Sequence, residues 1–458
     1  MWVNLNGKKI AVCTLGCKVN QYESDSVMDA LKACGCEVVA FSQEADIYIV
    51  NTCAVTNMAE RKSRQMLHRA KKLNPQAVVV AVGCYIQAAA DRDDILGEDM
   101  TKAAVIEKES RTYDNQEHLL QELGVDLLVG NNRKKDLPQI LEAYLDGRKV
   151  EDTIVDINHT EEYECMQLEK PNERCRAYVK VQDGCNNFCS YCIIPYTRGR
   201  TRSRSISDVL QEIQGLAKRG VQEVVLTGIN LSSYEDETGA DLLHLIQEVA
   251  GIEGIARIRL GSLEPRVITK QFLEGLVALP KVCPHFHLSL QSACNDTLKR
   301  MNRHYTIEEY MEKCRMIRSY YERPALATDI IVGFPGETEE EFATTYANLE
   351  ALKLYEMHVF KYSRRSGTPA ASMPNQVSDA DKDRRSDALL ALTAKQKAEY
   401  EADFVDEEVC VLVEEYEKRD AGCFRKGHTE RYIMVCDAAP EDVCRQSVNT
   451  FVRVRYQG

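Results

Sequence analysis

The chain alternates strand-like and helix-like segments with a regular rhythm between residues 176 and 362. Short apolar runs predict strands at Arg176–Gln182, Glu223–Thr227, Ala256–Gly261, His285–Gln291, Ala325–Val332 and His358–Tyr362. Helices are expected between them at Ser207–Lys218, Asp241–Val249, Thr269–Leu279, Thr306–Tyr320 and Thr338–Leu349. Strands joined by helical crossovers in this way predict a partial (β/α)6 barrel, a fold that binds its ligands at the carboxyl ends of the strands.

Three cysteines follow the first predicted strand of this barrel, in the sequence Gly184-Cys-Asn-Asn-Phe-Cys-Ser-Tyr-Cys192. The thiolates of Cys185, Cys189 and Cys192 can hold three irons of a 4Fe–4S cluster and leave the fourth iron open to a substrate. A zinc knuckle is the alternative, but zinc sites usually pair a CxxC with a second CxxC or a pair of histidines. The loop therefore predicts a 4Fe–4S cluster that binds and reductively cleaves S-adenosylmethionine.

A second α/β region precedes the barrel. Apolar runs predict strands at Lys9–Thr14, Glu37–Phe41, Ile47–Asn51, Ala77–Val82 and Asp126–Val129. Helical patterns lie at Asn20–Ala33, Asn57–Leu73 and Leu137–Leu145. This alternation predicts an α/β domain with a mostly parallel sheet. The polar, acidic stretch Asp91–Leu123 breaks the rhythm and is interpreted as an insertion or an irregular helical segment.

Cysteines follow three strands of this N-terminal region, at Cys17, Cys53 and Cys84. The carboxyl ends of neighbouring parallel strands lie on one edge of a sheet, so these thiols can meet although they are far apart in sequence. Gly16 and Gly83, each directly before a cysteine, would permit tight turns close to a cluster. The alternative is three buried, inert cysteines, since free cysteine is commonly buried. The recurrence of strand, turn and cysteine favours a second ligand set.

The rest of the chain predicts a linker, a helix and a small β domain. Arg148–Arg174 is polar and lacks a sustained period, as in a linker or a pair of edge strands. Asp379–Tyr400 is a helical stretch that would leave the barrel. After it, Cys410–Glu415, Glu430–Val435 and Val448–Tyr456 are β-like and separated by turn residues. A small antiparallel β-barrel fits this tail.

Composition indicates where such a chain works. Its 458 residues suffice for two or three domains, and no apolar run is long enough to cross a bilayer. The first residues lack a secretory signal, and the 18 cysteines are better explained by metal ligands and buried thiols than by disulfides. We therefore expect a cytoplasmic protein that does not bind membranes.

Local basic surfaces indicate an anionic partner, although the net charge is −13. Arg61–Lys72 holds six Lys or Arg residues and no acid. Beside the cysteine loop, arginines occupy every second position, at Arg198, Arg200, Arg202 and Arg204. We predict that these four arginines contact RNA phosphate, while a solvated face is the alternative for such a run. In the tail, Phe424–His428 joins an aromatic to basic residues in an expected loop, which suits RNA stacking.

Along nearly its full length the chain resembles the radical S-adenosylmethionine methylthiotransferases. The resemblance rests on several motifs: Thr14-Leu-Gly-Cys-Lys-Val-Asn-Gln-Tyr-Glu-Ser24, Asn51-Thr-Cys-Ala-Val55, Val82-Gly-Cys-Tyr85, Gly184-Cys-Asn-Asn-Phe-Cys-Ser-Tyr-Cys-Ile-Ile-Pro195, Arg198-Gly-Arg-Thr-Arg-Ser203, Thr227-Gly-Ile-Asn230, Gly333-Phe-Pro-Gly-Glu-Thr338 and Phe360–Pro369. It implies a methylthiotransferase domain at 8–147, a radical enzyme barrel at 171–378, a linking helix at 379–400 and an RNA-gripping TRAM domain at 401–458.

The resemblance also implies cofactors and a reaction. Cys17, Cys53 and Cys84 would hold an auxiliary 4Fe–4S cluster, beside the radical-generating cluster of the barrel loop. Gly16-Cys-Lys-Val-Asn20 looks like the family members that modify carbon 2 of N6-threonylcarbamoyladenosine at position 37 of tRNA. Members acting on isopentenyladenosine tend to carry Gly-Cys-Gln-Met-Asn, and those acting on a ribosomal protein Gly-Cys-Pro-Lys-Asn. An electron donor such as flavodoxin or ferredoxin would be a partner.

Supporting residues are expected near the strand ends of the barrel. Tyr191, Asn230, Glu264 and Gln291 are candidates for binding S-adenosylmethionine. Each can instead be purely structural. Two alternative functions remain open at this point: the same chemistry on isopentenyladenosine or on a ribosomal-protein aspartate, and a non-catalytic iron–sulfur protein that binds RNA.

Overall fold

The computed structural model describes residues 3–90, 116–169, 175–420 and 422–458. The chain forms two compact units that are interleaved in sequence. The N-terminal unit comprises residues 1–170, 183–204 and 363–372, and the barrel unit comprises residues 171–182, 205–362 and 373–458. The cysteine loop therefore belongs to the same unit as the N-terminal sheet. The domain limits predicted from the sequence are consecutive segments, whereas the two compact units are interleaved. Those limits therefore stay a prediction.

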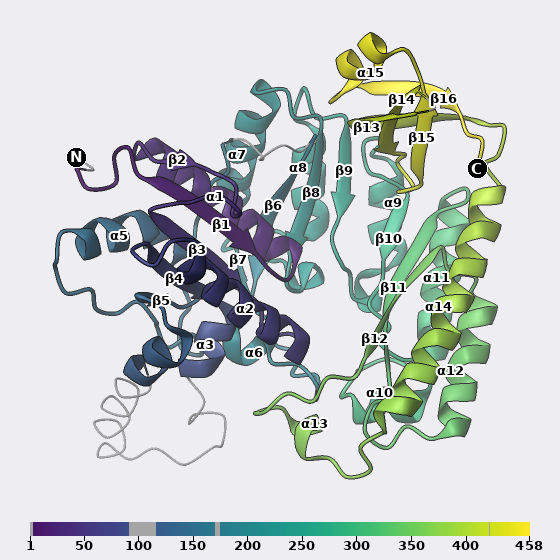
Figure 1. Cartoon of the computed structure of the whole chain (residues 1–458). Helices are drawn as coiled ribbons and strands as arrows, with labels where there is room; N and C mark the ends of the chain where they lie inside the picture. Colours follow the sequence, from purple (N-terminus) through teal and green to yellow (C-terminus); the bar gives the residue numbers. More distant parts are fainter. Residues whose placement is uncertain (1–2, 91–115, 170–174, 421) are drawn as a thin grey trace. The chain divides into compact units, whose positions relative to one another are not determined.

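A five-stranded parallel sheet forms the centre of the N-terminal unit, in the order β2–β1–β3–β4–β5 (Figure 1). Its strands are β1 (Lys9–Thr14), β2 (Glu37–Val38), β3 (Ile47–Thr52), β4 (Val78–Gly83) and β5 (Leu127–Val129). Its helices include α1 (Lys18–Ala33), α2 (Asn57–Leu73), α3 (Cys84–Ala90) and α5 (Leu137–Leu145). The prediction of a parallel α/β domain is confirmed.

Helices cover both faces of this sheet, as the central strand β3 shows. All six of its residues are buried. On one face, Tyr48 and Val50 join an apolar core with Leu67 of α2. On the other, the Asn51 side-chain amide donates hydrogen bonds of 3.0 Å to the Asn20 carbonyl oxygen and to Ser24 Oγ in α1. A strand buried on both sides needs a continuous apolar run, which explains the sequence pattern.

Six parallel strands of the barrel unit follow the predicted order. They are β6 (Arg176–Asp183), β8 (Glu223–Gly228), β9 (Arg257–Leu260), β10 (His285–His287), β11 (Ala325–Val332) and β12 (Glu356–Lys361). β6, β8 and β9 form one parallel group, and β10, β11 and β12 form another. An isolated parallel bridge between Leu263 and Leu288 links the two groups. The strands thus form the partial barrel that the sequence predicts.

Helices alternate with these strands, at α7 (Ile206–Lys218), α8 (Leu242–Ala250), α9 (Lys270–Val277), α11 (Ile307–Tyr320) and α12 (Glu339–Leu352). Capping explains several of their starts. The Thr306 and Thr338 side chains accept hydrogen bonds from the third residue of α11 and α12, and the glutamates there return the bond. The long helix α14 (Asp379–Ala402) then leaves the barrel and runs beside α12 (Figure 1).

The tail is a curled antiparallel sheet in the order β15–β14–β13–β16. Its strands are β13 (Glu408–Arg419), β14 (Gly422–His428), β15 (Met434–Ala438) and β16 (Phe451–Arg455), with the short helix α15 (Glu441–Ser447). An apolar core joins Val411 and Val454 of this sheet to Ala325 at the start of β11. Arg259 adds a polar link, because it pairs with Glu223 at 2.7 Å and donates to the Thr429 carbonyl oxygen at 2.6 Å. The antiparallel tail is confirmed.

The structure differs from the predicted elements in several places. β10 ends at His287 rather than Gln291; beyond it, Leu288 and Gln291 make only isolated bridges, and Gln291 takes a positive φ of 73°. Residues 424–428 lie in strand β14 rather than in a loop. The helices α10 (Asn295–Arg300) and α15 were not predicted. Of the stretch 91–123, residues 91–115 lie outside the described residues, and 116–123 are helical.

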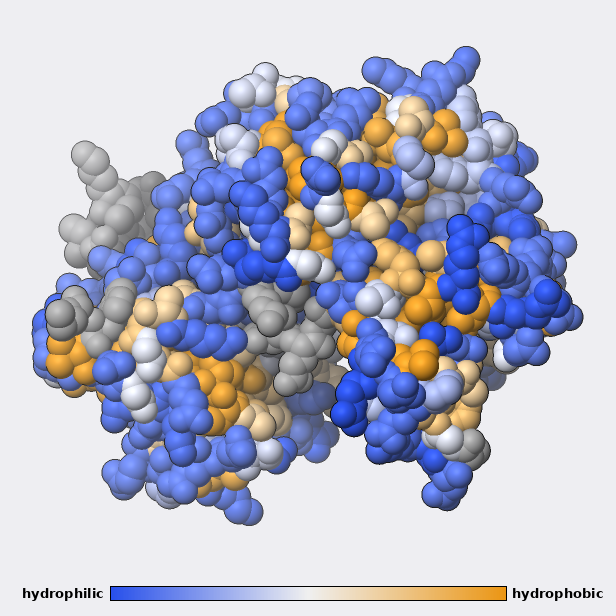
Figure 2. Space-filling view, turned by 90° about the horizontal axis from the view of Figure 1, so that it is seen from above, coloured by the Kyte–Doolittle hydropathy of each residue, from blue (hydrophilic) through white to orange (hydrophobic). Residues whose placement is uncertain are grey.

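Within the described ranges, no helix is both long and apolar enough to cross a membrane. The face shown in Figure 2 is mostly hydrophilic, with its apolar residues gathered in separate patches.

Candidate active site

The three N-terminal cysteines come together at one edge of the parallel sheet. Cys17 follows β1 and is the N-terminal capping residue of α1, Cys53 follows β3 directly, and Cys84 follows β4 as the first residue of α3. Burial, together with the neighbouring thiols of Cys84 and Cys17, raises the pKa of Cys53 to about 12. The three thiols thus lie close enough to influence one another, as the topology predicts.

Gly16 shows how tightly this edge is built. Its φ of +104° is one that residues with a side chain rarely adopt, and a Cβ placed there would lie 3.0 Å from Cys53 Sγ. Only glycine lets the turn before Cys17 pass so near the second thiol. This confirms the expectation that a glycine brings backbone close to the cysteine set.

Asn131 is a polar neighbour of this set that sequence reasoning missed. Its side-chain amide lies 3.5 Å from Cys84 Sγ and also donates to the Thr197 carbonyl oxygen at 2.6 Å. Hydrogen bonds to ligating sulfurs are one means by which proteins set the potential of an iron–sulfur cluster. A signal was available, since Asn131 comes two residues after strand β5 and therefore reaches the same sheet edge.

The cysteines of the barrel loop sit in a compact turn of the same unit. The Cys185 N–H donates to the Gly199 carbonyl oxygen at 3.1 Å, and the Cys192 N–H donates to the Cys189 carbonyl oxygen at 2.9 Å. A Cβ at Gly184 would lie only 1.9 Å from the Arg200 carbonyl oxygen, so this position also requires glycine. The loop is therefore held against the segment that follows it.

Both cysteine sets suit iron–sulfur centres. Each offers three thiols, the ligands that iron–sulfur clusters take in proteins. A buried thiol with a raised pKa stays protonated at neutral pH until a metal displaces the proton. The cationic Arg198 lies near Cys17, Cys53 and Cys84 and would offset the negative charge of bound thiolates.

Arg198 connects the two cysteine sets. It is fully buried and donates to Glu23 of α1 at 2.9 and 3.0 Å, to Asn20 Oδ1 at 2.6 Å, and to Asp183 at 3.0 Å. Asn20 also donates to the Thr52 carbonyl oxygen at 3.0 Å, directly before Cys53. Arg198 thus links α1, the helix that follows Cys17, to Asp183, which lies two residues before Cys185.

The charges around Arg198 are balanced. Lys134 is buried as well and pairs with Glu23, so two cations face the carboxylates of Glu23 and Asp183. Burial opposes the charge on Arg198, yet Asp183, the Cys84 thiol and Glu23 hold the pKa of Arg198 well above its usual value. Buried charges of this kind are tolerated when each is paired.

Burial corrects the RNA-contact prediction for three of the four arginines. Arg198, Arg202 and Arg204 are 0%, 6% and 1% exposed, and each bonds within the protein. They hold the loop in place and cannot reach an RNA phosphate. Arg200 is exposed, with its guanidinium 4.7 Å from the centre of the Phe188 ring. Phe188 in turn meets Tyr196 edge-on at 5.9 Å, so Arg200 alone still fits the prediction.

A pocket of about 810 Å³ opens beside both cysteine sets, in the N-terminal unit. Asn57 and Glu60 of α2, Ala88 of α3, and Ile193 and Tyr196 of the cysteine loop contribute to its wall. Residues 364–369 supply much of the remainder. Its volume lies in the range of small-molecule sites. Ala88 lies in the helix that Cys84 begins, and Ile193 directly follows Cys192, so elements of both sets form the pocket.

The candidates for binding S-adenosylmethionine lie in the cysteine loop or after strands of the barrel. Tyr191 is half-buried in the cysteine loop. In the barrel unit, the Asn230 N–H donates to Gln182 Oε1 at 2.7 Å after β8, and Arg303 holds both Glu264 oxygens at 2.8 and 2.9 Å after β9. Gln291 pairs with Ile330 through an isolated bridge. Their role stays a prediction.

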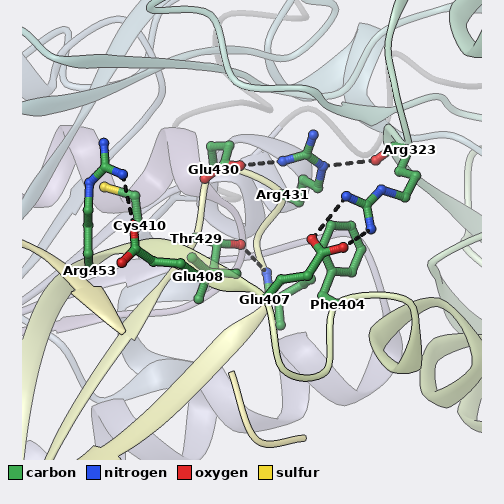
Figure 3. A pocket seen from close by; sticks show the side chains of 11 residues that line it. Arg323, Phe404, Glu407, Glu408, Cys410, Thr429, Glu430, Arg431 and Arg453 are labelled. Atoms are coloured by element: carbon green, nitrogen blue, oxygen red, sulfur yellow. Dashed lines mark hydrogen bonds and ion pairs between the residues drawn. The ribbon is translucent and has the colours of Figure 1, made fainter. Parts of the chain in front are cut away.

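A second pocket, in the barrel unit, has a different character. It measures about 200 Å³ and lies where the tail sheet meets Arg323 and Phe404 (Figure 3). All the arginines of its wall pair with glutamates: Arg323 with Glu407, Arg431 with Glu430 and Arg453 with Glu408. Because glutamates already pair with these arginines, the pocket does not suit an anionic ligand.

The tail residues expected to stack on RNA are also engaged within the protein. Arg425 pairs with Asp437 across the sheet, and Lys426 pairs with Glu417. His428 stacks on Tyr432 at 4.6 Å and bonds to Glu414. The predicted basic loop is therefore part of strand β14, and its basic side chains are already paired within the protein.

Comparisons with known proteins place the chain in a family. Residues 179–349 match the model of the Radical SAM superfamily, and residues 9–106 match the Uncharacterized protein family UPF0004. The threonylcarbamoyladenosine tRNA methylthiotransferase MtaB of Bacillus subtilis is 36% identical over 437 residues, which are 95% of this chain and 91% of that protein. The tRNA-2-methylthio-N(6)-dimethylallyladenosine synthase of Pelotomaculum thermopropionicum is 35% identical over 91% of this chain and 88% of its own length.

A solved structure shares the fold at low identity. The radical S-adenosylmethionine methyltransferase TsrM of Kitasatospora setae has a TM-score of 0.54 and 16% identity, and the match covers 80% of this chain and 74% of that one. The matches agree with the cysteine motifs and with the barrel. The chain therefore belongs to the methylthiotransferases of the radical S-adenosylmethionine superfamily.

Proposed function

We propose that this enzyme replaces the hydrogen on carbon 2 of N6-threonylcarbamoyladenosine in tRNA with a methylthio group. One observation carries the proposal: two cysteine triplets lie in one compact unit, beside a pocket large enough for a nucleoside. The relative from Bacillus subtilis, named for this substrate, supports the choice of nucleoside.

The two cysteine sets would divide the cofactors. Radical enzymes of this superfamily use one 4Fe–4S cluster and S-adenosylmethionine, and Cys185, Cys189 and Cys192 would be the ligands of that cluster. When bound, it supplies the electron that cleaves S-adenosylmethionine to a 5′-deoxyadenosyl radical. Cys17, Cys53 and Cys84 would hold a second 4Fe–4S cluster that carries or donates the sulfur. Carbon 2 of adenine has no leaving group, which is why radical chemistry is needed.

The protein's own residues hold these groups in place. Arg198 fixes the helix of Cys17 to the strand end before Cys185, and Asn131 donates toward Cys84. Tyr191, Asn230, Glu264 and Gln291 are proposed to contact S-adenosylmethionine. An external electron donor such as flavodoxin or ferredoxin would reduce the cluster, in the cytoplasm.

An exposed basic helix face supports RNA as the partner. On α2, which begins four residues after Cys53, the exposed basic side chains are Arg61, Lys62, Arg69 and Lys72. These cations match the negative charge of an RNA backbone. Arg200 over the Phe188 ring adds a cation and an aromatic face beside the cysteine loop.

Nucleoside analysis tests this proposal directly. We expect tRNA from a strain that lacks the gene to contain N6-threonylcarbamoyladenosine without its 2-methylthio form, as measured by mass spectrometry. The purified, reconstituted enzyme should restore the methylthio form on that tRNA when it is supplied with reductant, sulfide and S-adenosylmethionine. Loss of the methylthio form of dimethylallyladenosine instead would assign the enzyme to the other nucleoside.

A further inference from the structure

The wall of the large pocket includes a segment that is fastened to both cysteine regions. At one end, the Asn57 N–H donates to Ser363 Oγ at 3.0 Å, just after the Cys53 turn. At the other end, the Ala370 N–H donates to the Ser190 carbonyl oxygen at 2.8 Å, between Cys189 and Cys192. The residues between Ser363 and Ala370 are therefore held in position against the pocket.

Two adjacent arginines in this segment have opposite environments. Arg365 is buried and donates to Asn57 Oδ1 at 2.7 Å and to Glu60. Arg364 is exposed and lines the pocket. Within the part of the chain that the structure describes, Arg364 has no ion pair and no hydrogen bond. One arginine therefore builds the wall, and the other offers a charge to the pocket.

The charges of the pocket leave a positive excess. Its charged wall residues are Arg364, Arg365 and Glu60, and Glu60 is already paired with Arg365. Tyr196 adds a half-buried aromatic ring to the same wall. A flat ring and an unpaired guanidinium in one pocket suit a ligand with an aromatic base and an anionic substituent.

We propose that Arg364 binds the carboxylate of the threonylcarbamoyl group and so selects nucleosides with an anionic N6 substituent. This inference rests on the proposed function. The threonyl carboxylate is ionised at neutral pH, and a guanidinium can bind it through two parallel hydrogen bonds. A hydrocarbon substituent such as dimethylallyl offers Arg364 no acceptor, so that nucleoside would gain no bond from this residue.

The test compares three anticodon stem–loop RNAs that differ only at the N6 group. One carries the threonylcarbamoyl acid, one carries its methyl ester, and one carries unmodified adenosine. Binding to the reconstituted full-length enzyme is measured at fixed salt. We expect the wild type to prefer the acid over the ester by about tenfold to a hundredfold, the range for a hydrogen bond to a charged group.

Substitutions at Arg364 test whether this residue causes the preference for the acid. Arg364→Gln should bind the acid and the ester equally, with its affinity for the ester unchanged, and Arg364→Lys should keep part of the preference. Arg61→Gln, on the exposed face of α2, is the matched control: it should weaken all three RNAs by the same factor. A uniform loss for Arg364→Gln, or a wild type without preference, would overturn the proposal.

The binding test and the proposed methylthiolation can fail separately. If the wild type prefers the acid but forms no methylthio product, the proposed reaction fails while the carboxylate site stands. If it forms 2-methylthio-N6-threonylcarbamoyladenosine without any preference for the acid, the reaction stands and Arg364 has no part in selection.

Discussion

The two cysteine sets are built in opposite ways. Cys185, Cys189 and Cys192 share one loop of eight residues, and local turns hold that loop. Cys17, Cys53 and Cys84 come from three separate strand ends and meet only because the strands are parallel and adjacent. The first set is determined by local sequence, whereas the second depends on the whole sheet. Changes to the fold should therefore affect the second set first.

Removing Arg198 should have the largest effect on stability, because both sets depend on it. Arg198→Met would leave the buried Glu23 and Asp183 carboxylates short of a cation. We expect a loss of about 3–5 kcal/mol in unfolding free energy, as for other broken buried ion pairs. Urea denaturation of the unreconstituted protein measures it.

Arg200→Met is the matched control, since Arg200 is exposed two residues away. It should change the unfolding free energy by less than about 0.5 kcal/mol, the usual range for surface substitutions. Equal losses for the two variants would show that the Arg198 network does not stabilise the unit.

Gly16→Ala should impair the N-terminal cysteine set while leaving the barrel-loop set intact. The positive φ alone costs about 1–3 kcal/mol, and the added Cβ would also press on Cys53 Sγ. We expect reconstituted iron to fall toward the content of a single cluster, while reductive cleavage of S-adenosylmethionine continues. Iron and sulfide analysis beside a cleavage assay measures both.

Gly7→Ala is the control for backbone strain. Gly7 has a φ of +78°, but a Cβ there meets nothing within 4 Å. This variant should keep the full iron content. A Gly16→Ala enzyme that also kept its full iron content would contradict the close packing of Gly16 against the N-terminal set.

The smallest predicted effect concerns the exposed side of the barrel loop. Arg200→Gln should reduce the slope of log affinity against log salt concentration by about 1, the change expected when one phosphate contact is lost. Filter binding across a salt series measures that slope. Arg315→Gln, an exposed arginine of α11, should leave the slope unchanged. An identical slope for wild type and Arg200→Gln would remove the last member of the arginine run from the RNA surface.

The sequence placed the N-terminal cysteines correctly at one edge of the sheet, because that placement follows from parallel topology. The role of all six cysteines as cluster ligands stays a proposal. Spacing alone marked the barrel loop, and the repeated position after a strand marked Cys17, Cys53 and Cys84. Strands such as β1 and β11 have the limits predicted from their apolar runs. The prediction succeeded where the pattern is local or follows from parallel topology.

The prediction failed where contacts between residues distant in sequence determine burial or strand pairing. The alternating arginines gave no hint that Arg198 is buried, because its partner Glu23 lies 175 residues away. The tail segment 424–428 was predicted to be a loop, but neighbouring strands pair with it on both sides. Arg364 and Arg365 are neighbours of the same type, and only the structure distinguishes the free one from the paired one.

The central claim is that the two cysteine sets do different work. One reaction, run with excess S-adenosylmethionine, reductant and substrate tRNA, should be analysed for both 5′-deoxyadenosine and methylthiolated nucleoside. Cys185→Ala should yield neither product. Cys17→Ala should yield 5′-deoxyadenosine without any methylthiolated nucleoside, while Cys436→Ala, an exposed cysteine outside both sets, should yield both. Methylthiolated nucleoside from the Cys17→Ala enzyme would contradict the account.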